Sequence, residues 1–364
     1  MHIDELLGHS LESSNKMAKT FLCICLIAAL AVKASRVTKS PSVSQLELEF
    51  QEFESFAQSF NKQYSSEQEK FQRFEIFRDN LAYIRAFNSR EKSWKMRVNQ
   101  FADLTPEEFR SMYLRSFEPE NAEVEGVYGD DPDVVNWVKK GAVTSVKDQG
   151  QCGGCWAFST TGVMEGDWFI KYGELISLSE QELIDCNLKN YGCEGGAMPY
   201  AYEYVGNHGL TTENNYPYTA ANGKCNQKKV DEAKAWIKEY TLVYQNDPLA
   251  LKHAIAQQPV SVLVDASIWQ FYDGGIMTSF NCGTNLDHAV LAVGYDWNQK
   301  YWLVKNSWGT SWGESGYIRI GIEKGEGVCG IQMVPSYVTV SNTTVSNSNS
   351  ILLAVSSVLL LLNL

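Results

Sequence analysis

The sequence has 364 residues, 44% of them hydrophobic and 20% charged, which is enough for a folded protein of two or three domain-sized units. Its net charge of -12 argues against a basic nucleic-acid-binding surface and against a polybasic membrane surface, so no nucleic acid is expected as a partner. Eight of the nine arginines precede Asp131, and the chain therefore changes character near residue 130.

The first 34 residues have the layout of a secretory signal peptide. A cationic start at 17–19 is followed by the apolar run 21–32 and by small residues, which suits cleavage after Ala34. Met17 is an alternative start to Met1. Residues 1–34 are therefore predicted to direct the protein into the secretory pathway, where disulfides form.

Residues 35–130 are predicted to form a helical segment that contains no cysteine. Apolar residues recur at helical spacing over 45–60 and again from Ser66 to Asn88, where Ser66 and Glu69 form a capping box. A third helix is expected to open at Thr105-Pro106, because proline favours the first helical position. Residues 118–131 are acidic, contain glycine and indicate an exposed linker.

Beyond Pro132 the pattern becomes a mixture of helix and strand. Helices are expected over 155–170, 179–186, 198–207 and 248–257, and strands over 260–264, 288–295, 301–308 and 316–322. The order, helices first and strands second, predicts an α+β protein whose two halves meet at an interface.

Seven cysteines lie between Cys152 and Cys329, and an odd number leaves one free thiol if three disulfides form. The pair Cys152-Gly-Gly-Cys155 raises two alternatives, a zinc site and a thiol redox site. A zinc site would need a second close pair of ligands, and a redox pair would be expected to follow a strand. The sequence has no second close pair of ligands for zinc, and a Gly- and Gln-rich loop, not a strand, precedes Cys152.

A third interpretation fits better. Cys155 opens a predicted helix, where the unpaired N–H groups and the helix dipole lower the pKa of a thiol. His288 lies 133 residues downstream, and Asn306 follows 18 residues later in the next predicted strand. Cysteine, histidine and asparagine at this spacing indicate a nucleophile, its base and a residue that orients the base.

Three segments carry a resemblance to the papain family of cysteine proteases, in its cathepsin L-like branch: KDQGQCGGCWAF, LDHAVLAVGYD and KNSWGTSWGESGYIRI. The N-terminal segment is similar to the propeptides of that branch through Glu69, Arg73, Phe77, Asn80, Ile84 and Asn88, and through Asn99, Phe101 and Asp103. Two residues depart from the family pattern. Arg97 stands where glycine is usual, and Gly154 stands where serine or alanine is usual.

The resemblance implies an α+β, papain-like two-domain fold, with a helical left domain, a β-barrel-like right domain and an N-terminal helical propeptide. It implies an inhibitory propeptide over 35–130, a peptidase domain over 131–338 and a tail over 339–364. It also implies Cys155 as nucleophile, His288 as base, Asn306 as its orienting partner and Gln149, with the Cys155 N–H, as the oxyanion hole.

The disulfides implied by the resemblance join Cys152 to Cys193, Cys186 to Cys225 and Cys282 to Cys329. The implied substrate-binding residues, which include an apolar S2 pocket, are Gly195, Gly196, Ala197, Met198, Leu263, Leu286, Asp287, Trp308 and Val334. With no acid at its base, this pocket should favour apolar residues at P2.

We therefore expect a monomeric cysteine endopeptidase, made as a zymogen, that acts on proteins and peptides and needs no cofactor or metal. Its own propeptide is the expected inhibitor, and a lysosome, a vacuole or the extracellular space is the expected location. Two alternatives are a catalytically silent homologue, which would be expected to lack Cys155, His288 or Asn306, and a thiol oxidoreductase.

The tail after about Ser336 is not expected to be needed by the papain-like core. A small-residue site near Ser341 or Asn342, a polar spacer and the apolar run 351–364 have the layout of a glycosylphosphatidylinositol attachment signal. Asn342-Thr-Thr is also the only glycosylation sequon. A lipid anchor at the cell surface is one prediction, and a terminus that is trimmed during maturation is the other.

Overall fold

The computed structural model describes residues 43–90, 93–117, 124–279 and 282–343. The chain divides into two compact units, residues 1–52 and residues 53–364. The predicted signal peptide and the apolar terminus lie outside the described residues. In the part that the structure describes, no helix is both long enough and apolar enough to span a bilayer.

The N-terminal segment contains the three expected helices, α2 (Val43–Ser59), α3 (Glu67–Asn88) and α4 (Pro106–Tyr113). Thr105 and Glu108 form a complete capping box at the start of α4. At α3 the Ser66 hydroxyl accepts from the N–H of Glu69, but the Glu69 carboxylate accepts from Ser65 rather than from Ser66. The expected capping box is therefore incomplete, because the Glu69 carboxylate binds the residue before the N-cap instead of the N-cap itself.

Aromatic side chains form the core of this segment from residue 53 onward. The ring of Phe53 lies 5.5 Å from the rings of both Phe74 and Phe77 on α3. The Asn80 side chain donates to the carbonyls of Ala102 and Leu104, both at 2.9 Å. The polar residues that the propeptide resemblance singled out on α3 therefore hold the chain that follows the helix.

A strand that the sequence did not predict joins this segment to the rest of the second unit. Strand β1 (Trp94–Met96) pairs antiparallel with β5 (Tyr272–Met277), Trp94 lying opposite Gly275. Gly275 has a φ of +99°, and a Cβ there would lie 2.3 Å from the carbonyl oxygen of Ser93. Glycine thus permits the close approach of β1. Three residues are too few to show a strand periodicity in the sequence. The N-terminal segment, which was expected to be helical, thus contains a strand as well.

The remaining strands are β2 (Val134–Asn136), β3 (Trp236–Leu242), β4 (Val260–Val264), β6 (His288–Asp296), β7 (Tyr301–Lys305), β8 (Tyr317–Gly321) and β9 (Ser336–Ser341). The sheet order is β1-β5-β8-β7-β6-β4-β9-β3, and β2 pairs with β6. The pair β5–β8 is parallel and the other pairs are antiparallel. Strands β4 and β6 are buried along their whole length, which explains why their apolar runs were visible in the sequence.

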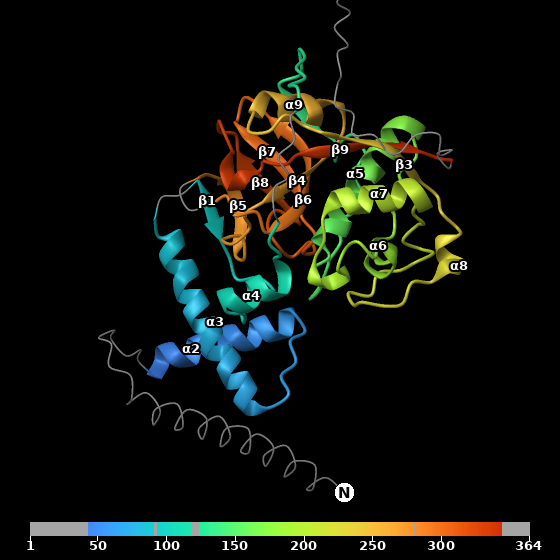
Figure 1. The fold of residues 1–364 in the computed structure, drawn as a ribbon. Helices are drawn as coiled ribbons and strands as arrows, with labels where there is room; N and C mark the ends of the chain where they lie inside the picture. The colour runs from blue at the N-terminus through green and yellow to red at the C-terminus, as the bar shows by residue number, and fades with distance from the viewer. Residues whose placement is uncertain (1–42, 91–92, 118–123, 280–281, 344–364) are drawn as a thin grey trace, which may run out of the picture. The chain divides into compact units, whose positions relative to one another are not determined.

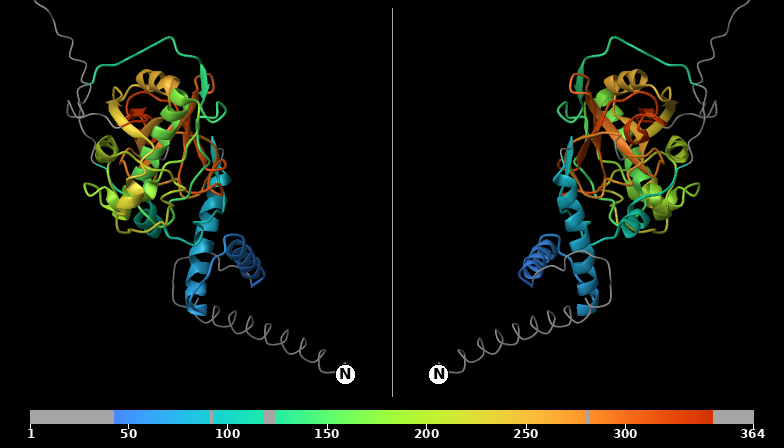
Figure 2. Two further views of the ribbon diagram at one scale, coloured as in Figure 1. Left: turned by 90° about the vertical axis from the view of Figure 1, so that its right-hand side faces the viewer. Right: turned by 90° about the vertical axis from the view of Figure 1, so that its left-hand side faces the viewer.

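The helical elements of residues 131–343 are α5 (Cys155–Tyr172), α6 (Glu180–Cys186), η2 (Gly192–Glu194), α7 (Met198–His208), α8 (Gln227–Val230), α9 (Pro248–Gln257) and η3 (Val328–Gly330). Helices α5 to α8 gather on one side of this region and strands β4 to β8 on the other (Figure 1). Helix α5 lies along the boundary and contacts β4, β6 and β9 as well as α6 and α7. Figure 2 shows the same green helix beside the orange strands from two further directions.

The expectation that the core needs nothing after about Ser336 is wrong. Strand β9 pairs with β3 as far as Ser341, and Val338 and Val340 are completely buried. The Lys171 ammonium group on α5 also donates to the Val340 carbonyl at 2.6 Å. The folded region therefore extends past residue 338, and the predicted attachment site at Ser341 or Asn342 adjoins a paired strand.

Candidate active site

Cys155 is the first residue of α5 and is fully buried. It is the one free cysteine among the described residues. Gly154 is the N-cap and provides no side-chain hydrogen bond to the helix. Burial raises the pKa of the Cys155 thiol to about 11, although the backbone amides of Ala289 and Trp156 act in the opposite direction. The effect of the Ala289 amide places the thiol beside the residue that follows His288.

His288 begins β6, and its imidazole is held on two sides. Its Nε2 lies 2.7 Å from Oδ1 of Asn306, and its ring stacks on Trp308 with the ring centres 4.7 Å apart. Because a side-chain carbonyl oxygen only accepts, Nε2 carries the proton and Nδ1 is left as the acceptor. Among the described residues, Nδ1 has no hydrogen-bond partner. Burial lowers the pKa of His288 to about 4, and the bond with Asn306 acts in the opposite direction.

Asn306 lies directly after β7, which ends at Lys305, and not within the strand as expected. The Asn306 N–H donates to the carbonyl of Gly316 at 3.0 Å, which continues the β7–β8 pairing by one bond beyond Lys305 and Tyr317. Asn306 Oδ1 also accepts from the Ser307 N–H at 2.8 Å, in addition to its bond with His288. This second bond fixes the amide so that its oxygen faces the imidazole.

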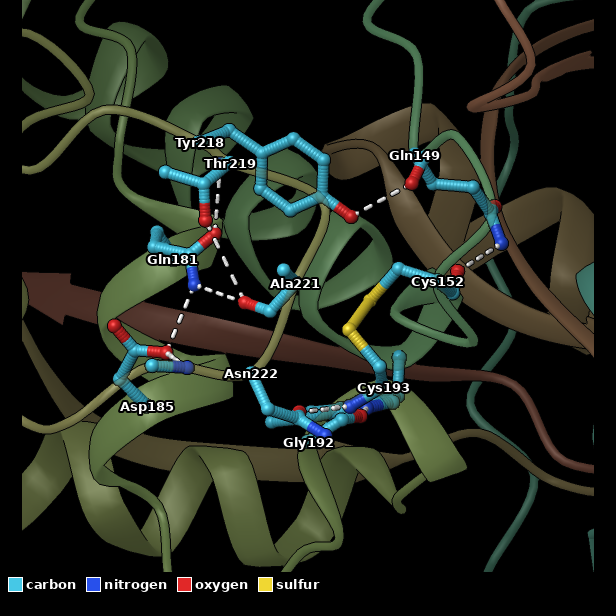
Figure 3. The surroundings of a disulfide bond; sticks show 12 residues. Gln149, Cys152, Gln181, Asp185, Gly192, Cys193, Tyr218, Thr219, Ala221 and Asn222 are labelled. Atoms are coloured by element: carbon cyan, nitrogen blue, oxygen red, sulfur yellow. Dashed lines mark hydrogen bonds between the residues drawn. A yellow bond between two sulfur atoms is a disulfide. The ribbon is translucent and has the colours of Figure 1, made fainter.

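Gln149 is fully buried and is hydrogen-bonded at its main chain and its side chain. Its N–H donates to the Ser307 carbonyl at 2.8 Å, and its Oε1 accepts from the Ser307 hydroxyl at 2.7 Å. Its Nε2 donates to the carbonyl of Cys152 at 3.0 Å, and its own carbonyl accepts from the Tyr218 hydroxyl at 2.8 Å (Figure 3). The sequence analysis missed Ser307 and Tyr218. The position of Ser307 between Asn306 and Trp308 was a signal, whereas nothing in the sequence pointed to Tyr218.

The three disulfides join Cys152 to Cys193, Cys186 to Cys225 and Cys282 to Cys329, the pairs that the resemblance implies. Figure 3 shows the first of them, with the Asn222 side chain accepting from the Cys193 N–H at 2.7 Å. Because Cys152 is bonded to Cys193, Cys152 and Cys155 do not form a redox pair or a shared zinc site in this state.

Comparisons with known proteins agree with this geometry. Residues 131–339 match the papain family cysteine protease domain, and residues 53–109 match the cathepsin propeptide inhibitor domain. The chain belongs to the papain family of cysteine proteases. It is therefore a cysteine-type peptidase that is synthesised with an inhibitory propeptide.

Three similar proteins show the extent of the similarity. The senescence-specific cysteine protease SAG39 of Oryza sativa subsp. japonica is 44% identical over 350 residues, which cover 89% of this chain and 99% of the rice protein. A recombinant stem bromelain precursor has a TM-score of 0.75 at 40% identity and covers 80% of this chain and 99% of its own. A digestive procathepsin L 3 of Tenebrio molitor has a TM-score of 0.73 at 38% identity, with coverages of 80% and 99%.

The propeptide of this protease runs between two sides of the predicted substrate cleft. The Arg115 N–H donates to the Asp287 carbonyl at 2.7 Å, and the Phe117 N–H donates to the Leu286 carbonyl at 2.9 Å. On the other side, the Arg115 guanidinium donates to the Cys193 carbonyl at 3.3 Å, and its stem packs at Gly195. Residues 115–117 thus occupy the space between segments 193–195 and 286–287, which contain Gly195, Leu286 and Asp287 of the expected substrate-binding residues.

The other expected substrate-binding residues differ in their burial. Met198, Leu263 and Leu286 are buried, whereas Gly196, Ala197 and Val334 are partly exposed. The segment that contains Leu286 meets the end of the strand that contains Leu263, because the Asp287 N–H donates to the carbonyl of Val264 at 2.9 Å. The assignment of these residues to an S2 pocket stays a prediction.

The propeptide packs against the indole ring of Trp308. Phe101, Phe109 and Tyr113 all meet its ring edge-on, with ring centres 5.2 to 6.2 Å away. Arg97, a residue that departs from the family pattern, binds the loop that follows Trp308, where its guanidinium donates to the Ser311 and Gly313 carbonyls. The same guanidinium forms an ion pair with Asp273 on β5. The propeptide therefore covers the face of the aromatic cluster that encloses His288.

Proposed function

We propose that the propeptide-free enzyme hydrolyses internal peptide bonds through Cys155, His288 and Asn306, with Gln149 in the oxyanion hole. The observation that carries the proposal is the tautomer of His288. Asn306 holds the proton on Nε2, which leaves the lone pair of Nδ1 available as a base. The only free thiol of the described residues, that of Cys155, interacts with the backbone of Ala289, the residue after His288. A base of this kind activates a cysteine nucleophile.

In the proposed reaction, His288 Nδ1 takes the proton of Cys155, and the sulfur attacks the carbonyl carbon of the scissile bond. The resulting imidazolium gives its proton to the leaving amine, and water, with His288 again as base, then releases the acid product. The Cys155 N–H and the Gln149 Nε2–H would stabilise the oxyanion. The Gln149 Nε2 group carries two hydrogens, and one of them donates to the Cys152 carbonyl, so the other can donate to the substrate.

Two further features support an endopeptidase of the secretory pathway. Residues 115–117, which lie in the interior of the propeptide, contact both sides of the predicted cleft, and this suits an enzyme that binds the interior of a polypeptide, as internal cleavage requires. Three disulfides suit an oxidising compartment. The predicted signal peptide and most of the predicted anchor signal lie outside the described residues, so the lipid anchor, like the monomeric state, stays a sequence-based prediction.

The apolar character of Met198, Leu263 and Leu286 predicts specificity at P2. We expect peptides with Phe or Leu at P2 to be hydrolysed with a kcat/KM at least about tenfold above that of peptides with Arg at P2, because an apolar pocket does not compensate for the desolvation of a guanidinium. Fluorogenic dipeptides that differ only at P2 measure this ratio. Equal or faster cleavage of the Arg-Arg peptide would contradict the pocket assignment and would leave the nucleophile untouched.

Acidification is predicted to lower the stability of the folded propeptide. Burial acts to raise the pKa of Glu108, but hydrogen bonds from Arg73 and from the Thr105 N–H outweigh it and hold the pKa below its usual value. A carboxylate with a lowered folded-state pKa adds stability above its unfolded pKa of roughly 4.3, and that stability is lost as the pH falls through the folded value. The contacts between α3 and α4 should therefore weaken below about pH 4.5.

The Glu108→Gln variant tests this expectation in the full-length zymogen. We expect it to process itself at a higher pH than the wild type, because its neutral amide lacks the ion pair with Arg73 at every pH. The exposed neighbour Glu107 provides the matched control, and Glu107→Gln should leave the pH midpoint unchanged. The midpoint is read from the appearance of mature enzyme on gels. Identical midpoints for the two variants would exclude a role of Glu108.

A further inference from the structure

A network of four charged side chains is buried behind the proposed catalytic residues. The Lys147 ammonium lies 3.1 Å from Glu165 and 2.6 Å from Glu180. The Thr144 hydroxyl donates to the other oxygen of Glu165 at 2.6 Å and accepts from Lys305 at 2.9 Å. The exposed fractions are 16% for the Lys147 side chain, 2% for that of Glu165, 0% for that of Glu180 and 8% for Lys305. The network thus contains two lysines and two glutamates, and burial raises the pKa of Glu180 to about 7.

The burial of these charges is not explained by stability alone. Ion pairs in a protein interior often contribute no more than apolar residues of similar volume would, because desolvation is costly. When one partner is removed, however, an uncompensated charge remains and the surrounding structure shifts. Such a network therefore holds a particular arrangement of the elements that it joins.

The elements that it joins are those that carry the proposed catalytic residues. Lys147 precedes Gln149 by two residues, Glu165 lies on α5, which begins with Cys155, and Lys305 directly precedes Asn306. A cavity of about 20 Å³, enough for one water molecule, is lined by Lys147, Glu165, Glu180 and Lys305 together with Asn306 and Ser307. The network and the partner of His288 thus border the same space.

We propose that Lys305 is a positioning residue for the hydrolytic reaction, which acts through Thr144 and Glu165 to hold Asn306 and β7 against the helix that carries Cys155. The proposal rests on the proposed function of Cys155, His288 and Asn306. A loss of register between these elements would misplace His288 relative to the thiol. Misplacements on the order of 1 Å can cost up to about 10²-fold in rate.

The protonation state of Lys305 decides the pH at which this proposal is tested. Burial lowers the pKa of Lys305 to about 8, while Glu165 on α5 and Glu180 on α6 act in the opposite direction and Lys147 acts in the same direction as burial. At pH 6, Lys305 therefore carries its charge, and its removal by mutation changes the net charge of the network by one.

The experiment compares Lys305→Met, Glu165→Gln and the double variant as mature enzymes at pH 6. The turnover number is expressed per active thiol, which is titrated with an irreversible thiol inhibitor so that unfolded molecules are not counted. We expect each single variant to lose about tenfold in kcat with KM changed less than about twofold, because the substrate cleft is not altered. We expect the double variant, which restores the net charge of the wild-type network, to recover to within about threefold of the wild type.

Two controls keep the test decisive. Lys238→Met removes an exposed lysine from β3 and should leave kcat unchanged. If Lys305→Met does not yield folded protein, Thr144→Val breaks the same link without a change of charge and should lower kcat about threefold or more. Unchanged kcat per titrated thiol in both Lys305→Met and Thr144→Val, with only a lower melting temperature, would overturn the proposal. An inactive wild-type mature enzyme would instead overturn the proposed function.

Discussion

The Cys155→Ala substitution is expected to lower peptide hydrolysis by about 10⁴-fold or more and to leave the zymogen unprocessed. The reason is that no other free thiol exists among the described residues, since the six remaining cysteines there form disulfides. Residual catalysis by binding and by oxyanion donors alone is small when a nucleophile is lost. Hydrolysis of a fluorogenic peptide, with the concentration of folded protein matched, measures the loss.

The Gln149→Ala variant is expected to lose less activity than Cys155→Ala. Loss of one oxyanion donor costs about 10²–10³ in turnover, so this variant should retain measurable activity while Cys155→Ala does not. Neither substitution removes a disulfide-bonded cysteine, and both proteins should fold. Substantial hydrolysis by Cys155→Ala would mean that another group is the nucleophile, and the roles proposed for His288 and Asn306 would fall with it.

Removal of the propeptide is expected to raise the alkylation rate of Cys155 at pH 7 by at least about 100-fold. In the zymogen, burial raises the pKa of the thiol to about 11, and burial also keeps the neighbouring His288 neutral, with its pKa lowered to about 4. About one thiol in 10⁴ is then ionised at pH 7, and only the thiolate reacts. The thiolate–imidazolium pair expected for the active enzyme is therefore not favoured while the propeptide covers both groups.

Mass spectrometry of the peptide that contains Cys155 gives this rate for the zymogen and for the mature enzyme. A variant of the propeptide provides an intermediate state. Phe109→Ala removes one of the rings packed on Trp308 and should raise the rate in the zymogen, because water then reaches the cluster around His288 more often. Equal rates in zymogen and mature enzyme would show that the propeptide does not shield the thiol.

The sequence by itself determined most of the elements that carry the chemistry. Strands β4 and β6 are buried on both faces, so their residues had to be apolar, and their runs were recognisable. Helices α4 and α9 begin with a capping residue followed by proline, which sets their start locally. Cys155, His288 and Asn306 were found because their residue types and spacing are specific, and the odd number of cysteines indicated a free thiol before any pairing was known.

The tertiary structure alone decided how these elements meet. The residues that pair with β1 lie at least 176 residues away in the chain, and those that pair with β9 lie at least 75 residues away, so no local pattern reveals them. The hydrogen bonds of Tyr218 to Gln149 and of Arg115 to Cys193 likewise join distant segments. The protonation of Cys155 depends on burial, and burial is a property of the whole fold with the propeptide in place.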